Sequence, residues 1–189
     1  MGKGQTMGQY AANRAALLTC VSNFAGVGPG HSAVVVDGYV YTFERVVGAW
    51  RVSNRSGWVQ IRTKDYLDQN RHRPVVVQEF SPGKVRAGAI RAFIAQSDAA
   101  DDDYLSSGVC SQLAAEAIGA GILGTVDPNG PNIPYTIYRY VKRTGCVAKS
   151  YYTFPDEHRY PRIGHRRMTL LAFTPECGKP VASPDILRW

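Results

Sequence analysis

The hydrophobic and polar positions of this chain follow two different periods, which predict a mixture of strands and helices. β-branched apolar residues fill Ser32–Val36 and return over Tyr39–Val47. The Asp37-Gly38 pair between them is a typical two-residue hairpin turn, so these runs are predicted to pair antiparallel. Apolar residues at helical spacing predict a helix over Val85–Gln96 and another over Gly108–Ala120.

Shorter segments complete the predicted order of elements. Helical spacing predicts helices over Gln9–Val21, from Thr63 or Lys64 to Asn70, and over Tyr135–Arg143. Strands are predicted over Trp58–Arg62, Pro74–Phe80, Ala148–Phe154 and Met168–Phe173, before an irregular proline-rich tail. Strands outnumber long helices and the hairpin implies antiparallel pairing, so the predicted class is α+β.

Length and composition are those of one ordinary globular domain. The chain has 189 residues, of which 44% are hydrophobic and 20% charged, which predicts a single folded domain over 1–189. No apolar run approaches the length of a membrane span. The segment Met1–Met7 lacks the apolar core of a secretory signal, so we expect synthesis in the cytoplasm without a signal peptide.

The charge of the chain favours an anionic partner. Lys and Arg number 22 against 15 Asp and Glu, which gives a net charge of +7 and suits nucleic acid, cell-wall polymers or lipid headgroups. The densest basic stretch is Arg159–Arg167. Without a nucleic-acid-binding motif, a solvated basic loop is the favoured interpretation of that stretch.

Neither metal nor cofactor binding is predicted. The four cysteines lack the paired short spacings of a zinc site, and Cys20, Cys146 and Cys177 are interpreted as structural or incidental thiols, with disulfide pairing left open. The glycine-rich loop 24–30 leads into a strand and has no following Lys-Ser/Thr pair, which argues against nucleotide binding. The acidic run 98–103 is interpreted as a solvated connector.

Two residues in this pattern can support nucleophilic catalysis. Cys110 stands at the start of a predicted helix, where backbone N–H groups and the helix dipole favour a thiolate. His31 stands at the mouth of a β-branched strand, which can hold an imidazole rigidly as a base. Either motif alone is more typical of plain packing, and the combination raises the hypothesis of a cysteine hydrolase.

A third group is needed to orient the imidazole. Thr42 and Glu44 lie on the strand that returns beside His31 and, with period-two alternation, share one face. Glu44 is the first choice, because a carboxylate also stabilises an imidazolium; Thr42 is the alternative, and Gln78 on the following apolar strand comes next. The carboxylate of Glu44 equally suits an ion pair with one of the nearby arginines, Arg45 or Arg51.

These residues resemble a known family. The run Gly30–Glu44 (GHSAVVVDGYVYTFE), followed much later by Cys110–Ala114 (CSQLA), is similar to the circularly permuted NlpC-like cysteine peptidases of the papain-like superfamily, in which histidine precedes cysteine. The resemblance covers about 30–140 and includes the proline-led segment Ile133–Tyr138. The extension 146–189 matches nothing, and its role is left open.

The resemblance implies a papain-like fold, in which a small antiparallel sheet packs against the helix that carries the cysteine. It implies that Cys110 is the nucleophile, His31 the base and Glu44 the orienting residue. The backbone N–H of Cys110 would contribute to an oxyanion hole, to which Tyr104 can add a hydroxyl. The implied activity is that of an amidase or endopeptidase, commonly on peptidoglycan stem peptides.

Small, basic hydrolases of this kind resemble antibacterial cell-wall amidase effectors of type VI secretion. That resemblance implies delivery by the secretion machinery to the periplasm of a target bacterium, and an immunity protein in the producer. The bond that is cut and the oligomeric state stay open.

Two rival functions are compatible with parts of this pattern. A thioester-forming acyltransferase or phospholipase like lecithin retinol acyltransferase has the same His-before-Cys order, but its usual Asn-Cys-Glu-His-Phe run is absent around Cys110. A basic binding module without enzymatic activity would make Cys110 a core thiol and His31 a structural residue.

Overall fold

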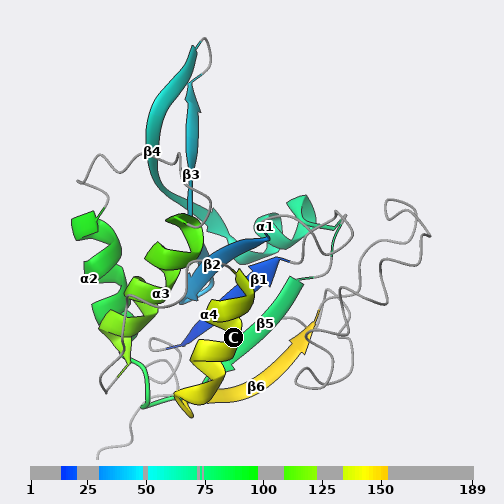
Figure 1. Ribbon diagram of the computed structural model, residues 1–189, viewed down its shortest axis with the longest axis vertical. Coiled ribbons are helices and arrows are strands. Elements are labelled where there is room, and N and C mark those ends of the chain that lie inside the picture. Colours follow the sequence, from blue (N-terminus) through cyan, green and yellow to red (C-terminus); the bar gives the residue numbers. More distant parts are fainter. Residues whose placement is uncertain are drawn as a thin grey trace, which may run out of the picture.

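The computed structural model describes residues 14–20, 30–48, 51–71, 73, 75–97, 109–122 and 134–152. This part of the chain forms six strands and four helices (Figure 1). The strands are β1 (Ala15–Cys20), β2 (His31–Val36), β3 (Tyr39–Gly48), β4 (Arg51–Arg62), β5 (Val75–Phe80) and β6 (Val147–Tyr152). The helices are α1 (Thr63–Gln69), α2 (Ala87–Ser97), α3 (Val109–Gly121) and α4 (Pro134–Arg143). The α+β class predicted from the sequence is confirmed.

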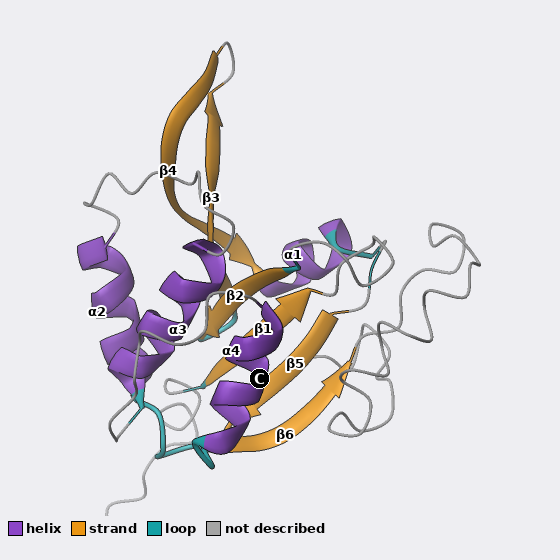
Figure 2. Ribbon diagram, viewed as in Figure 1, coloured by secondary structure: helices purple, strands orange, loops and turns teal. Residues whose placement is uncertain are grey.

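The six strands form one antiparallel sheet in the order β4-β3-β2-β1-β5-β6 (Figure 2). Strands β1 and β2 occupy its centre. The hairpin of β3 and β4 extends beyond the other strands as an arm (Figure 1).

Successive side chains of each strand point to opposite faces of this sheet. On one face, here called the helix face, Leu17 and Val34 pack in one core cluster with residues of α2, α3 and α4. On the other, here called the α1 face, Leu18 and Val35 pack in a second cluster with Tyr66 of α1. Figure 1 shows α2, α3 and α4 gathered together, with α1 apart from them.

The helix predicted over Gln9–Val21 is wrong, because its described part, Ala15–Cys20, is strand β1. All six residues of β1 are buried, and the strand pairs with β2 on one side and β5 on the other. A strand buried on both faces shows a continuous apolar run instead of alternation. In such a run the pairing of the neighbouring strands outweighs the helix propensity of alanine and leucine.

The predicted hairpin is confirmed. Asp37 and Gly38 connect β2 to β3, and both have positive φ angles, 49° and 83°. Two consecutive left-handed residues are what a type I′ turn requires, and its twist matches that of the paired strands. Val36 then stands opposite Tyr39.

The other described elements agree with their predictions, with shifted ends. The predicted strand Trp58–Arg62 is the last part of the longer β4. The helix predicted from Val85 begins at Ala87, because Val85 forms bridges with Pro82 and Ile122. The predicted strand over 168–173, residues 24–29 of the glycine-rich loop, the acidic run and the tail lie outside the described residues. Within the described part of the chain, no helix is both long and apolar enough to cross a membrane.

Candidate active site

His31 opens strand β2 and stands opposite Cys20 of β1. Residues directly opposite each other in an antiparallel pair share a face, so His31 belongs to the α1 face with Cys20. The glycine before it is required by a close approach, since a Cβ on Gly30 would lie 2.5 Å from the backbone oxygen of Cys20. The side chain of His31 is only 13% exposed, so the strand holds it in a nearly dry position.

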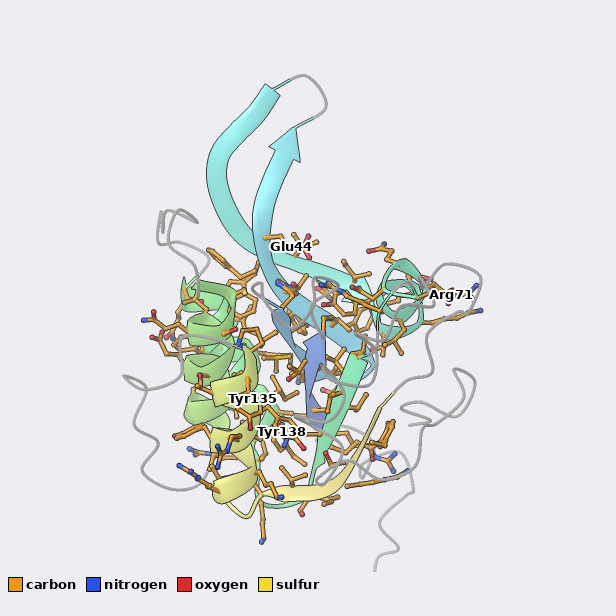
Figure 3. All side chains as sticks on the ribbon, turned by 45° about the vertical axis from the view of Figure 1, so that its right-hand side comes forward. Glu44, Arg71, Tyr135 and Tyr138 are labelled. Atoms are coloured by element: carbon orange, nitrogen blue, oxygen red, sulfur yellow. The ribbon has the colours of Figure 1, made fainter. Side chains whose placement is uncertain are left out.

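A chain of hydrogen bonds joins His31 to a carboxylate. The Nε2 atom of His31 is hydrogen-bonded to Oγ1 of Thr42, which in turn donates to Oε1 of Glu44 at 3.2 Å. Glu44 Oε1 lies 3.9 Å from His31 Nε2. The direct contact therefore belongs to Thr42, and Glu44 acts on the ring mainly through the threonine. Glu44 lies where the β3–β4 arm leaves the sheet (Figure 3).

The hydrogen bonds from His31 through Thr42 to Glu44 determine which ring nitrogen of His31 carries the proton. An ionised carboxylate only accepts hydrogen bonds, so the single hydroxyl proton of Thr42 is directed to Glu44. The threonine oxygen must then accept from His31, which places the ring proton on Nε2. Nδ1 keeps a lone pair and is the nitrogen that can act as a base.

Burial keeps this imidazole neutral. Desolvation, followed by the positive charge of Arg73, lowers the pKa of His31 to about 4. At neutral pH the ring of His31 is therefore uncharged and its Nδ1 lone pair is free, while the lowered pKa makes it a weaker base than an exposed imidazole.

Cys110 is the second residue of α3, and it is 8% exposed. Its Sγ lies 3.9 Å from Oγ of Ser111. The N–H groups of the first turn of a helix have no acceptor within the helix, so the N–H of Cys110 is available to an oxyanion. Tyr104, the second expected contributor, lies outside the described residues.

A buried hydrogen bond joins the start of α3 to the start of β2. Oγ of Ser111 lies 3.1 Å from Oγ of Ser32, and both side chains are buried. Ser111 follows Cys110 directly and Ser32 follows His31, so the bond brings together the two segments that carry the predicted base and nucleophile.

The thiol of Cys110 and the imidazole of His31 nevertheless come from opposite faces of the sheet. Ser32 points to α3 on the helix face, whereas His31, its neighbour, points to the α1 face with Cys20. In the described part of the chain, no hydrogen bond connects Cys110 with His31.

A polar network next to His31 was missed by sequence reasoning. Cys20 Sγ lies 3.4 Å from the hydroxyl of Tyr66 and 3.7 Å from Oδ1 of Asn70. Asn70 Oδ1 also accepts from Nε and Nη2 of Arg73, at 2.9 and 2.7 Å. The spacing of four residues between Tyr66 and Asn70 was the one available signal, since it puts both on one side of the predicted helix.

Burial affects the reactivity of Cys20. Burial raises the pKa of the Cys20 thiol, so this thiol stays protonated and unreactive at neutral pH. Cys20, Cys110 and Cys146 are all free thiols, and Cys177 lies outside the described residues.

Gln78, the reserve candidate for orienting His31, lies on the other face of the sheet. It stands opposite Leu17 of the helix face, and its Nε2 donates to the backbone oxygen of Tyr138 at 3.2 Å. Tyr138 belongs to α4 (Figure 3). The side chain of Gln78 therefore binds α4 to the sheet. The side chains of Arg45 and Arg51, the alternative partners of Glu44, lie outside the described residues.

Among the described residues, no group of three or more His, Cys, Asp or Glu side chains is arranged to hold a metal ion. The chain gives no match in comparisons with protein-family models, curated proteins and solved structures.

Proposed function

We propose that the protein is a cysteine amidase or endopeptidase of the circularly permuted NlpC-like type, with Cys110 as nucleophile and His31 as base. The observation that carries the proposal is the hydrogen-bond chain Glu44–Thr42–His31. The residue after His31, Ser32, is hydrogen-bonded to Ser111 at the start of α3. A nucleophile, a base and a group that orients the base are the three parts that thiol catalysis needs.

In the reaction, Nδ1 of His31 takes the proton from Cys110 Sγ, and the thiolate attacks the amide carbonyl carbon. The backbone N–H of Cys110 stabilises the oxyanion that forms. The imidazolium then protonates the leaving nitrogen as the C–N bond breaks, which leaves a thioester on Cys110. Water, deprotonated by His31, hydrolyses the thioester and restores the thiol.

Thr42 and Glu44 serve this cycle by holding the Nε2–H tautomer. While His31 carries the second proton, the nearby carboxylate of Glu44 stabilises the imidazolium. Its 43% exposure reduces that effect by solvent screening, so we assign the larger share of positioning to Thr42.

The substrate that we propose is the stem peptide of peptidoglycan. The net charge of +7 attracts the protein to an anionic polymer, and the sequence resemblance suggests the same substrate. In this proposal the protein is an antibacterial effector delivered to the periplasm of a target bacterium, and an immunity protein protects the producer.

The experiment is a digestion of purified peptidoglycan with mass analysis of the released fragments. We expect new amide cleavage with the wild type and none with Cys110→Ala. The matched control is Cys146→Ala, which removes another buried free thiol and should leave cleavage unchanged. Folding of each variant is checked by circular dichroism. Cleavage by a folded Cys110→Ala variant would refute the assignment.

A further inference from the structure

Arg73 is a partly buried guanidinium that lacks a carboxylate partner within the described part of the chain. Two of its donors, on Nε and Nη2, are used by the neutral Oδ1 of Asn70. Arginine has five N–H donors in a planar fork that matches a carboxylate. The hydrogen bonds to Asn70 fix the position of the group, and no carboxylate among the described residues compensates its positive charge.

The neighbouring arginine shows the ordinary arrangement. Arg71 is 52% exposed on its side chain and pairs with Asp68 at 2.8 Å; Figure 3 shows it beside α1 at the edge of the molecule. Arg91 likewise pairs with Asp37. Charges that are withdrawn from water are normally paired, so the lack of a carboxylate beside the partly buried Arg73 within the described part of the chain needs a reason.

Arg73 lies beside the base of the proposed active site. Asn70, to which Arg73 donates, is 3.7 Å from Sγ of Cys20, and Cys20 stands opposite His31. After desolvation, the positive charge of Arg73 is the second cause of the lowered pKa of His31.

His31, the base of the proposed site, therefore lies between a negative charge on one side and a positive charge on the other. Thr42 and Glu44 belong to β3, His31 to β2 and Cys20 to β1, and these strands are adjacent in this order. The carboxylate of Glu44 lies on the β3 side of His31 and the guanidinium of Arg73 lies on the β1 side. A substrate that reaches His31 comes near both charges.

We propose that Arg73 binds a carboxylate of the substrate, so that the protein selects amides with a free carboxylate near the scissile bond. The inference rests on the proposed amidase function and adds the chemical class of its substrate. A bidentate guanidinium–carboxylate pair at this position would compensate the partly buried charge and fix the substrate relative to His31.

The test measures binding to the full chain carrying Cys110→Ala, which prevents turnover. The two probes are a synthetic stem tetrapeptide, L-Ala-γ-D-Glu-diaminopimelyl-D-Ala, and the same peptide with every carboxylate converted to an amide. We expect calorimetry to show the acidic peptide binding at least about tenfold more tightly, as a charged hydrogen-bonded pair allows. Arg73→Gln should abolish this preference and Arg73→Lys should keep part of it.

The matched control is Arg71→Gln, which removes an exposed arginine two residues away and should keep the preference. Equal binding of the two peptides by the parent protein overturns the inference, and this comparison does not depend on the folding of any Arg73 variant. Absence of binding by both peptides, or equal loss of preference in Arg71→Gln and Arg73→Gln, also overturns it.

Cleavage assays with the unmutated protein separate this inference from the proposed function. If both peptides are cut with equal kcat/KM, the amidase assignment stands and the role of Arg73 is refuted. If neither is cut while carboxylate-dependent binding through Arg73 persists, the carboxylate site stands and the amidase assignment fails.

Discussion

The two faces of the central sheet treat their buried polar groups differently. On the α1 face, hydrogen bonds link His31 to Thr42 and Glu44, and link Cys20 to Tyr66, Asn70 and Arg73. On the helix face, Ser32 and Ser111 bond to each other, whereas Oγ1 of Thr19 and Oε1 of Gln78 have no partner among the described residues.

This difference separates two roles within the same strands. Polar groups of the α1 face form two hydrogen-bonded networks, one ending at the carboxylate of Glu44 and the other at the guanidinium of Arg73, which suits proton transfer and recognition of a charged substrate. Those of the helix face hold α3 and α4 on the sheet, as Ser111 and Gln78 do. Changes on the α1 face should therefore alter catalysis and pH dependence, whereas changes on the helix face should alter stability.

The largest effect is expected from His31→Ala. Without its base the thiol is not deprotonated and the leaving nitrogen is not protonated, so kcat/KM for peptide cleavage should fall by about 10²- to 10⁴-fold. Steady-state kinetics on the acidic tetrapeptide measure the loss. A folded variant with more than about a tenth of the wild-type rate would contradict the role of His31.

The second effect concerns acid stability. The pKa of His31 is about 4 in the folded protein and about 6.5 when the chain is unfolded. Between these pH values the unfolded chain binds more protons than the folded protein. The contribution of the neutral His31 to the free energy of unfolding is therefore fully present above about pH 6.5 and is lost as the pH falls to about 4. The loss from this group is on the order of 3 kcal/mol.

Urea unfolding at pH 7 and pH 4, on wild type and His31→Gln, checks this linkage. Glutamine does not titrate, so the variant should lose less stability on acidification by about that amount. Arg73, whose charge also disfavours the imidazolium, is retained in both proteins. Parallel losses in the two proteins would show that His31 is not held neutral.

The third effect compares Thr42 with Glu44. Thr42→Val leaves the Nε2–H of His31 without its acceptor in a buried position, which costs about 1–3 kcal/mol and should lower kcat about 10- to 100-fold. Glu44→Gln retains an oxygen that can accept from Thr42, so its effect should be a few-fold. Sequence reasoning alone favoured the opposite ranking, and a larger loss in Glu44→Gln would return the main role to the carboxylate.

The sequence predicted the hairpin and the helices because their signals are local. Asp37-Gly38 specifies its own turn, and the start of α3 is visible in the apolar periodicity after Cys110. Strand β1 was not predictable in this way, because only its pairing with β2 and β5 distinguishes Ala15–Cys20 from a helix.

In the candidate site, too, the contacts that are local in the sequence were predictable and the contacts that depend on tertiary packing were not. His31, Thr42 and Glu44 lie within 14 positions of a single hairpin, so strand alternation was enough to put them together. The contacts of Cys20 with Tyr66 and Asn70 span 46 and 50 positions, and they depend on how α1 packs against the sheet. The separation of His31 and Cys110 onto opposite faces was hidden for a similar reason, because it depends on the position of α3.

A further effect tests the helix face. Ser111→Ala leaves the buried hydroxyl of Ser32 without its partner and should reduce the free energy of unfolding by about 1–3 kcal/mol. The double variant with Ser32→Ala should cost less than the two single changes together, because the removal of both hydroxyls leaves neither one unpaired. Urea unfolding of the four proteins measures the coupling, and strict additivity would show that the bond contributes nothing.

The smallest effect is expected from Thr19→Val, the counterpart of Ser111→Ala on the same face. Thr19 is buried and stands opposite Ser32, yet its hydroxyl has no partner among the described residues. Valine has the same shape and suits a strand, and it removes a polar group that folding takes out of water without compensation. The free energy of unfolding should therefore stay unchanged or rise by about 1 kcal/mol. A loss in urea unfolding comparable to that of Ser111→Ala would show that this hydroxyl is bonded, and the contrast between the two faces would then be reduced.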